Sequence, residues 1–480
     1  MPQFFQIQDI GAIVPELELV VFGMFLLIFD LLIENKRKLG LLALAGIAIS
    51  GLFLFRLRDV DFSAYGGALV LDPFSIFFKL IFLIAAALSI AISLKYLDIE
   101  RENHGEYYAL ILFATMGMMF MAGAVDLVTL YIGLETMAIA TYILVGFLRS
   151  NQKSNEASMK YFLLGAFSSG ILLYGMSLLY GLSGSTRFVD IAEALSRRPV
   201  TDPISVMAMV TLSAGMFFKI AAVPFHQWTP DAYEGAPTSI TAFMSVAVKA
   251  ASFAMLVRIF MVAIYPLRPQ WLPIMVAVSV MTMTLGNIAA ITQSNVKRML
   301  AYSSISHAGY ILIGFIAGNE TGMTAVPLYL LIYTFTNLGT WAVIVALRRR
   351  DVIGEQIDDM AGLFFRHPTG AVLMLIFLLS LAGIPPTAGF IAKYYLFAAA
   401  IETGHNVLAV IAVINAAISL YFYFRIVVSM FMREATEKTG LVYAPGLTMT
   451  LAIATVFTLW IGIYPDPFIA MARHAITLGF

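Results

Sequence analysis

Long apolar stretches recur along the whole chain, and most polar residues lie in short connections between them. A helix needs about 20 mostly apolar residues to cross the hydrocarbon core of a bilayer, and continuous runs of that length differ from the alternating pattern of barrel strands. The pattern predicts fourteen membrane-spanning helices, near residues 12–33, 38–55, 73–94, 107–124, 125–147, 159–181, 203–224, 238–262, 272–293, 298–318, 325–347, 370–402, 406–431 and 446–468. The predicted fold class is therefore an all-α polytopic membrane protein.

The connections between these spans are short. The longest, near 56–72, 182–202 and 348–369, are too small to hold a separate folded domain. Residues 1–15 show neither a basic n-region nor a small-residue cleavage site, so no removable signal peptide is predicted. The function is thus expected to lie within or across the membrane.

Basic residues in the connections predict the orientation of the chain. One set of connections holds seventeen Lys and Arg residues, among them Arg348, Arg349, Arg350 and Lys438, whereas the opposite set holds eight, among them Arg187 and Arg258. Because Lys and Arg are enriched in cytoplasmic loops, the first set is predicted to be cytoplasmic and both termini non-cytoplasmic. The four remaining basic residues lie inside predicted spans: Lys79, Lys219, Lys249 and Lys393.

The composition supports a membrane protein and narrows its chemistry. Of the 480 residues 60% are hydrophobic and 12% charged, about half the roughly 25% usual in soluble domains, which excludes soluble enzymes, nucleic-acid-binding proteins and disordered scaffolds. The chain contains no Cys, which excludes disulfides, cysteine nucleophiles and thiolate ligands for iron–sulfur clusters in this chain.

Charged residues inside the spans are the first functional candidates, because each costs at least about 2.5–3.5 kcal/mol at the bilayer centre. Glu135 lies about midway along its span, and Lys249 lies too near the centre of its helix to reach either surface. Lys219 precedes Pro224 by five residues, so the proline predicts a kinked or unwound helix beside the amine. In contrast, Lys79 is expected to extend to the membrane surface, and Asp126 is expected to be an interface residue.

The stretch 370–402 is too long for one straight span, and Pro385 and Pro386 interrupt it one to two turns before Lys393. Broken backbone at membrane depth persists only where it is buried in protein or lines a cavity, as in the ion sites of transporters. The two interrupted spans are the seventh and the twelfth. Their spacing predicts two inverted five-helix repeats, with helices 1–3 in residues 1–106, helices 4–8 in 107–262, helices 9–13 in 263–431 and helix 14 in 432–480.

One carboxylate and three amines make a poor metal site, but they suit proton transfer. A Glu–Lys pair at about 4 Å attracts by roughly 4 kcal/mol at an effective dielectric of 20, whereas burial favours the neutral amine. These opposed effects predict a Lys that gains or loses its proton as its distance from Glu135 changes. His226 and His307 are candidates for the same relay. The alternatives are structural: buried ion pairs, kinks and packed histidines.

Three further segments carry a family resemblance: Val223–Thr238, Lys297–Tyr310 and Gly383–Tyr394. Together with Glu135 they resemble the antiporter-like membrane subunits of respiratory complex I, over nearly the whole chain. The resemblance is strongest to the subunit N family, the counterpart of mitochondrial subunit 2. Tyr-Glu-Gly-Ala-Pro at 233–237 and Lys rather than Glu at 393 favour this family, as does a chain without a long lateral helix.

The resemblance implies a non-redox, proton-translocating subunit in the bacterial inner membrane. Glu135 would pair with Lys219, Lys249 would pass charge onward, and Lys393 would face the proton exit or a neighbouring subunit. NADH, FMN, iron–sulfur clusters and quinone would be bound by other subunits, and the neighbours would include antiporter-like subunit M and the small subunits K and J. Two alternatives are an Mrp-type cation/proton antiporter subunit and the equivalent subunit of a ferredoxin-linked quinone oxidoreductase.

Trp228, Trp271 and Trp460 are expected to be interface anchors.

Overall fold

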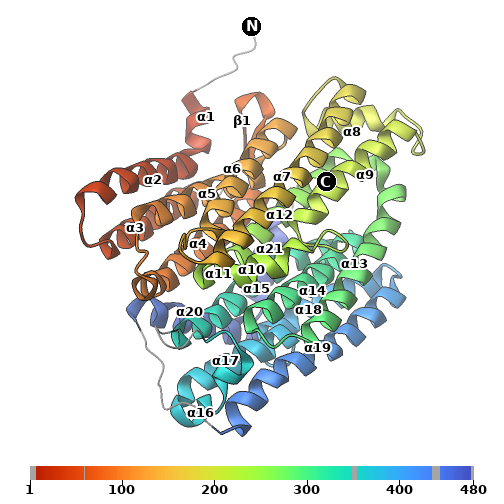
Figure 1. Ribbon diagram of the computed structural model, residues 1–480. Helices are drawn as coiled ribbons and strands as arrows, with labels where there is room; N and C mark the ends of the chain where they lie inside the picture. The colour runs from red at the N-terminus through yellow and green to blue at the C-terminus, as the bar shows by residue number, and fades with distance from the viewer. Residues whose placement is uncertain (1–6, 59, 349–353, 435–443, 477–480) are drawn as a thin grey trace.

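The computed structural model describes residues 7–58, 60–348, 354–434 and 444–476 (Figure 1). Within these ranges, eleven helical segments are long and apolar enough to cross a membrane: α3 (Arg37–Arg56), α4 (Pro73–Glu100), α5 (Gly105–Gly123), α6 (Leu127–Val145), α7 (Gln152–Ser183), Thr238–Ala263, Tyr265–Ile291, α14 (Val296–Ala317), α15 (Glu320–Leu347), α19 (Asn406–Met432) and α20 (Pro445–Ile463). The all-α membrane fold is confirmed, whereas the number of fourteen spans stays a prediction. Arg349, Arg350 and Lys438, which entered the charge comparison, lie outside the described residues.

Three other predicted spans are not among these eleven segments. The first is α2 (Val14–Leu32), which carries the carboxylates Glu16, Glu18 and Asp30. The predicted seventh span, residues 203–224, contains α9 (Pro203–Lys219), and α10 (Trp228–Gly235) follows the break. The twelfth consists of α17 (Pro368–Ala382) and α18 (Ala388–Glu402). Both predicted helix breaks are therefore confirmed.

Short elements complete the architecture. The helices are α1 (Ile7–Ala12), α8 (Phe188–Ser196), α16 (Leu363–Arg366) and α21 (Asp466–Ala475). The segment Thr238–Ala263 contains α11 (Thr238–Phe243) and α12 (Lys249–Arg258), with π-helical turns at Met244–Val248 and Ile259–Ala263. Within Tyr265–Ile291, a 3₁₀ turn precedes α13 (Arg268–Ile291). The connection after α3 forms a hairpin that the sequence pattern did not predict, with strands β1 (Phe62–Ala64) and β2 (Leu69–Leu71).

The N-terminal helices α2 and α3 lie at one edge of the molecule and α19 at another (Figure 1). Between them, α14, α15 and the segment Thr238–Ala263 form the centre, since 94% of the most apolar window of each is buried. The helices α5 and α6 cross closely at Gly117 and Gly133. A Cβ atom at Gly117 would lie 2.7 Å from the carbonyl oxygen of Gly133, so only small residues allow this crossing. The crossing fixes the position of Glu135, two residues farther along α6.

One end of the bundle is closed by backbone hydrogen bonds around the β1–β2 hairpin, and we call it the hairpin end. Val125 N donates to Ala68 O at 3.2 Å, and Phe188 N donates to Val125 O at 3.0 Å. The helices α4 and α6 begin at this end, and α7 finishes there. Asp126 is the N-cap of α6, and its carboxylate accepts from Val128 N at 2.8 Å.

The structure corrects the prediction for Lys79. Its side chain is 1% exposed, and Nζ lies 2.6 Å from Oε1 of the buried Glu16 on α2. A carboxylate on the neighbouring helix therefore takes the place of water as the partner of the amine, and the side chain does not extend to the surface.

Arg258 also differs from its predicted place in a connection. It is the last residue of α12, is buried, and pairs with Asp72 at 2.7 Å between Nη2 and Oδ1. The predicted span 238–262 already contained Arg258, and the error lay in the charge comparison, which counted this arginine with the connections.

Candidate functional site

The first helix break exposes backbone groups that nearby side chains satisfy. α9 ends at Lys219, and the indole Nε1 of Trp228 donates to Phe218 O at 3.0 Å. Val223 N donates to Oγ1 of Thr282 on α13 at 3.0 Å. Because buried backbone groups need partners, these two hydrogen bonds stabilise the interruption. The break therefore places the amine of Lys219 at the end of a half-helix.

Lys219 and Glu135 form the first group of ionisable residues. The Lys219 side chain is buried, and Nζ has no hydrogen-bond partner among the described residues. It lies 6.0 Å from the ring centroid of Tyr142, and the Glu135 carboxylate acts on it electrostatically. Glu135 is only partly buried, although its Oε1 atom is enclosed and has no partner. No hydrogen bond thus joins the two residues, and they interact through electrostatic attraction.

Lys393 lies at the second helix break, against the end of α17. Its Nζ donates to Leu381 O at 3.1 Å and Ala382 O at 2.8 Å, and it lies 5.0 Å from the ring centroid of Tyr310. The C-terminal end of a helix carries partial negative charge, and an aromatic face attracts a cation. The break therefore forms a pocket suited to a protonated amine.

Gly383 makes this arrangement fit. Its φ of +86° is in the left-handed region, and a Cβ atom there would lie 2.7 Å from Cδ of Lys393. A glycine therefore allows both the turn after α17 and the close approach of the Lys393 side chain.

Lys249 and Lys393 are joined through one face of α14. The amine of Lys249 donates to Ser304 O, and His307 follows one turn later on the same helix. His307 is buried, with Nδ1 2.6 Å from the hydroxyl of Tyr329 and Nε2 3.2 Å from that of Tyr423. Both Lys249 and Lys393 lie close enough to act electrostatically on His307. The structure thus brings together three of the residues that the sequence singled out.

A small cavity of about 10 Å³ lies between His307 and the second break. Tyr333, Thr336 and Ser380 are among its polar lining residues, together with Leu381, whose carbonyl accepts from Lys393. That volume is roughly the space that one water molecule needs. The cavity thus lies beside His307 and the end of α17, although Lys393 itself does not line it.

The region between Lys219 and Lys249 is packed with aromatic side chains. The ring of Tyr142 lies 4.6 Å from that of Tyr161, which stacks on Trp228 at 4.5 Å. Trp228 lies 6.3 Å from Tyr233. These rings connect the surroundings of the two amines through packing, and the hydroxyl groups of the tyrosines are the polar groups along this row.

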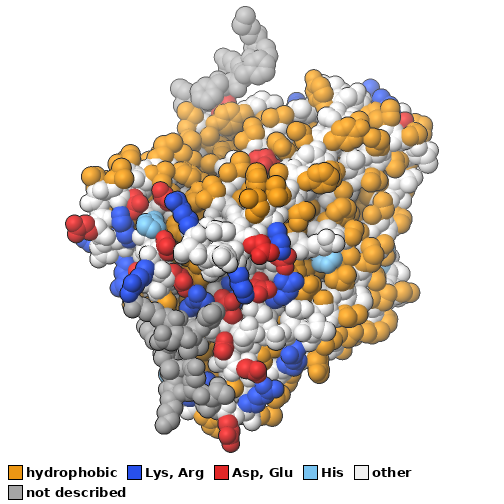
Figure 2. Space-filling model, in the orientation of Figure 1, with side chains coloured by type: hydrophobic (Ala, Val, Ile, Leu, Met, Phe, Trp, Pro, Cys, Tyr) orange, Lys and Arg blue, Asp and Glu red, His pale blue; other side chains and the backbone are white. Residues whose placement is uncertain are grey.

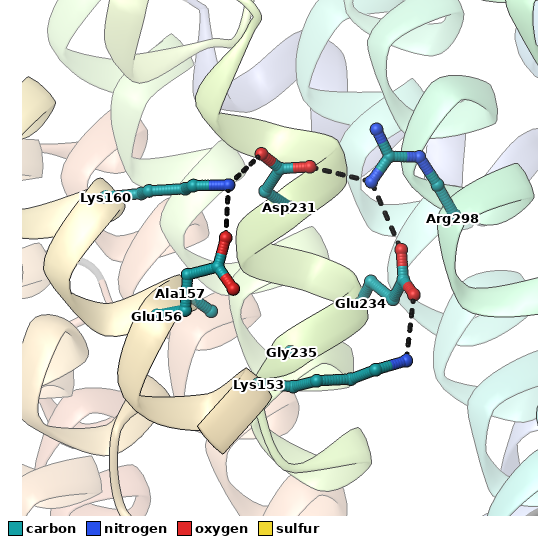
Figure 3. A pocket seen from close by; sticks show the side chains of 8 residues that line it. All are labelled: Lys153, Glu156, Ala157, Lys160, Asp231, Glu234, Gly235 and Arg298. Carbon is teal, nitrogen blue, oxygen red and sulfur yellow. Dashed lines mark hydrogen bonds and ion pairs between the residues drawn. The ribbon is translucent and has the colours of Figure 1, made fainter. Parts of the chain in front are cut away.

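Charged side chains gather on one face of the molecule (Figure 2), where a pocket of about 200 Å³ opens between α7, α10 and α14 (Figure 3). We call it the charged pocket. Asp231 accepts from Arg298 at 2.7 Å and from Lys160 at 2.9 Å. Glu234 pairs with Arg298 at 3.1 Å and with Lys153 at 3.3 Å. These contacts fasten α10, the second half of the first broken helix, to both of its neighbours.

Burial opposes ionisation of Asp231, but the hydrogen bonds from Arg298 and Lys160 outweigh it and hold the pKa of this carboxyl below its usual 3.8. The cluster is therefore charged at neutral pH.

Other predicted residues lie elsewhere. His226 is half-buried between α9 and α10, and its Nδ1 atom has no hydrogen-bond partner in the part of the chain that the structure describes. Trp228 and Trp271 are buried and donate to backbone carbonyls, so the prediction that they anchor the membrane interface is wrong. Trp460 is 46% exposed, as an interface anchor would be.

Sequence reasoning did not find the hydroxyl partners of His307 or the buried carboxylates Glu16 and Asp72. Glu16 lies inside a predicted span, and a carboxylate at that position could have marked it as a buried charge. Tyr329 and Tyr423, the partners of His307, resemble ordinary core residues in the sequence. Among the residues that the structure describes, no group of three His, Asp or Glu side chains is placed to hold a metal ion.

Comparison with known proteins places this architecture in a family. The family model of the transmembrane region of NADH:quinone oxidoreductase and Mrp antiporters matches residues 124–419. A relative from Solibacter usitatus, NADH-quinone oxidoreductase subunit N 2, is 50% identical over 98% of this chain and 98% of its own length. The chain belongs to the subunit N branch of this transmembrane family.

Solved structures agree with this membership. A chain of respiratory complex I from Thermus thermophilus with bound aureothin is 30% identical, with a TM-score of 0.82 over 96% of this chain and 99% of that one. A chain of the Mrp complex from Dietzia has a TM-score of 0.84 at 22% identity, covering 97% of both chains. The similarity to the Mrp chain shows only that the two chains share a fold.

Proposed function

We propose that this chain is a proton-translocating membrane subunit of an NADH:quinone oxidoreductase, and that Glu135, Lys219, Lys249 and Lys393 carry the protons. The observation that carries the proposal is the placement of Lys219 and Lys393 at two broken helices, with Lys249 and His307 at the centre of the bundle. Membership of the subunit N branch supports the coupling to quinone reduction.

The first transfer involves Glu135 and Lys219. Because no direct hydrogen bond joins them, a small change in their separation alters the attraction between carboxylate and ammonium. A closer carboxylate favours the charged amine, and a more distant one lets burial favour the neutral amine. Moving one proton against 100 mV requires about 2.3 kcal/mol, which is less than the roughly 4 kcal/mol of one close pair at an effective dielectric of 20.

The second transfer runs from Lys249 to Lys393. His307 lies between them and has a hydroxyl near each ring nitrogen, so it can accept a proton at one nitrogen and donate from the other. The carbonyl groups of Leu381 and Ala382 then stabilise the protonated form of Lys393. Tyr161 and Tyr233 lie along the row that connects Lys219 with Lys249. His226 would serve on the exposed side of the first break.

The partly exposed Glu135 supports a permanent neighbour. A carboxylate in mid-span costs free energy where it faces lipid, so another membrane subunit is expected to cover α6 at this point. The antiporter-like subunit M and the small subunits K and J are the proposed neighbours. We place the charged pocket on the cytoplasmic side of the bacterial inner membrane and the hairpin end and both termini on the other side, following the bias of Lys and Arg.

NADH, FMN, iron–sulfur clusters and quinone are assigned to other subunits in this proposal. The chain has no Cys to ligate an iron–sulfur cluster, and the buried amines suit charge transfer rather than electron transfer. The segments 107–262 and 263–431 are proposed as inverted repeats, each containing one broken helix.

Replacement of Glu135 by Ala tests the proposal. Inside-out vesicles from cells with the E135A complex should lose most NADH-driven proton uptake, while NADH oxidation with an artificial acceptor shows that the complex is assembled. The control is E106A, because the side chain of Glu106 is 56% exposed. Normal pumping by an assembled E135A complex would remove Glu135 from the mechanism.

A further inference from the structure

A second pair of buried charges lies apart from the proposed proton carriers. The carboxylate of Asp72 and the guanidinium of Arg258 are 2.7 Å apart, and their side chains are 5% and 4% exposed. Asp72 caps α4 and also accepts from Ser75 N at 2.8 Å. Arg258 Nε donates to Ala122 O at 3.1 Å, and its guanidinium lies 4.6 Å from the ring centroid of Phe74. The pair thus ties together the ends of α4, α5 and α12.

This pair lies in line with Lys249. Both cations are on α12, nine residues apart, which corresponds to about 13 Å along a helix. Lys249 begins this helix and Arg258 ends it, and a π-helical turn flanks each end. Because Asp72 follows β2 directly, the pair stands between Lys249 and the hairpin end.

Most buried residues of α12 between the two cations are apolar. Phe253, Leu256 and Val257 of α12 are at most 1% exposed. On the facing side of α4, the ring of Phe78 lies 4.6 Å from that of Phe74 and 6.2 Å from that of Phe82. Between the two cations α12 carries no carboxylate and one hydroxyl, that of Ser252, which donates to Val248 O at 2.7 Å.

The chemistry of the pair adds to the barrier. Arg keeps its proton at all physiological pH values, so it cannot pass a proton on as Lys or His can. Asp72 already accepts hydrogen bonds from Arg258 and the backbone of Ser75, so its carboxylate is held in place.

We propose that the Asp72–Arg258 ion pair is a proton-tight seal that separates Lys249 from the non-cytoplasmic surface. The inference rests on the proposed function for its direction across the membrane. It assigns a barrier role to two residues that take no part in the transfer itself, and it directs the proton on Lys249 toward His307 and Lys393.

Passive proton permeability of the assembled complex tests the seal. The complex is reconstituted in liposomes, its quinone site is blocked with an inhibitor, and the decay of an imposed pH difference is followed with an internal pH dye. R258A and D72S/R258S should speed the decay about tenfold, the change produced by a barrier lower by about 1.4 kcal/mol. The double variant keeps a residue that caps α4 and leaves no unpaired buried charge.

The matched control is E16S/K79S, which removes the other buried ion pair without touching α12. It should remain as tight as the wild type. Wild-type permeability in an assembled D72S/R258S complex would overturn the seal, and so would an equal leak in E16S/K79S, since general loosening would then explain both. The E135A experiment separates the two proposals. If the D72S/R258S complex is tight and the E135A complex does not pump, the seal alone is refuted. If the D72S/R258S complex leaks and the E135A complex pumps normally, the transfer route alone is refuted.

Discussion

Replacing Gly383 by Ala probes how the second broken helix holds Lys393. Two costs are expected. The backbone at φ +86° costs an alanine roughly 1–2 kcal/mol in the left-handed region. In addition, the new Cβ would lie 2.7 Å from Cδ of Lys393, so the amine must move away from the carbonyls of Leu381 and Ala382. Loss of one hydrogen bond from a charged donor adds about 1.5–3 kcal/mol.

Gly404 provides a matched control, because its φ is +78° and nothing lies within 4 Å of a Cβ built there. G404A should carry the backbone cost alone, whereas G383A should be destabilised by both costs and should also pump less. Thermal denaturation of the purified complex gives the first quantity, and NADH-driven fluorescence quenching in vesicles gives the second. Equal denaturation midpoints and equal pumping in the two variants would refute the argument that Gly383 positions Lys393.

Two further predictions concern residues around the route. H307L should lower proton-coupled turnover about a hundredfold, which is a usual contribution of a positioned acid–base group. The control H104L changes the exposed His104 and should leave turnover unchanged. Wild-type turnover in H307L would exclude His307 from the route. D231N should lower the denaturation midpoint at pH 7. The difference from wild type should vanish as the pH falls below 3.8 and through the lower folded-state pKa of Asp231, because a depressed carboxyl pKa stabilises the fold only where the group is ionised. A difference that persists at low pH would contradict the ion-pair explanation.

Physical reasons explain which features were predictable from the sequence. Apolar run length and the prolines at 224, 385 and 386 predicted the membrane class and both breaks, because bilayer thickness and backbone hydrogen bonding act on local sequence. For the same reason Lys219, Lys249 and Lys393 were identifiable as charges that no membrane surface can reach. The hairpin at 62–71 was missed, since strands of three residues leave no periodic signal.

The partners of the buried charges were decided only by tertiary structure. Lys79 meets Glu16, Arg258 meets Asp72, and Lys249 meets Ser304 from helices far apart in the sequence. Hydropathy gives the depth of a residue in the membrane but not the rotation of its helix, and rotation determines which neighbour a side chain faces. The chain by itself therefore specified a membrane bundle with charges at mid-depth, whereas the packing of the helices determined that His307 stands between two amines and that Glu135 lies at an edge.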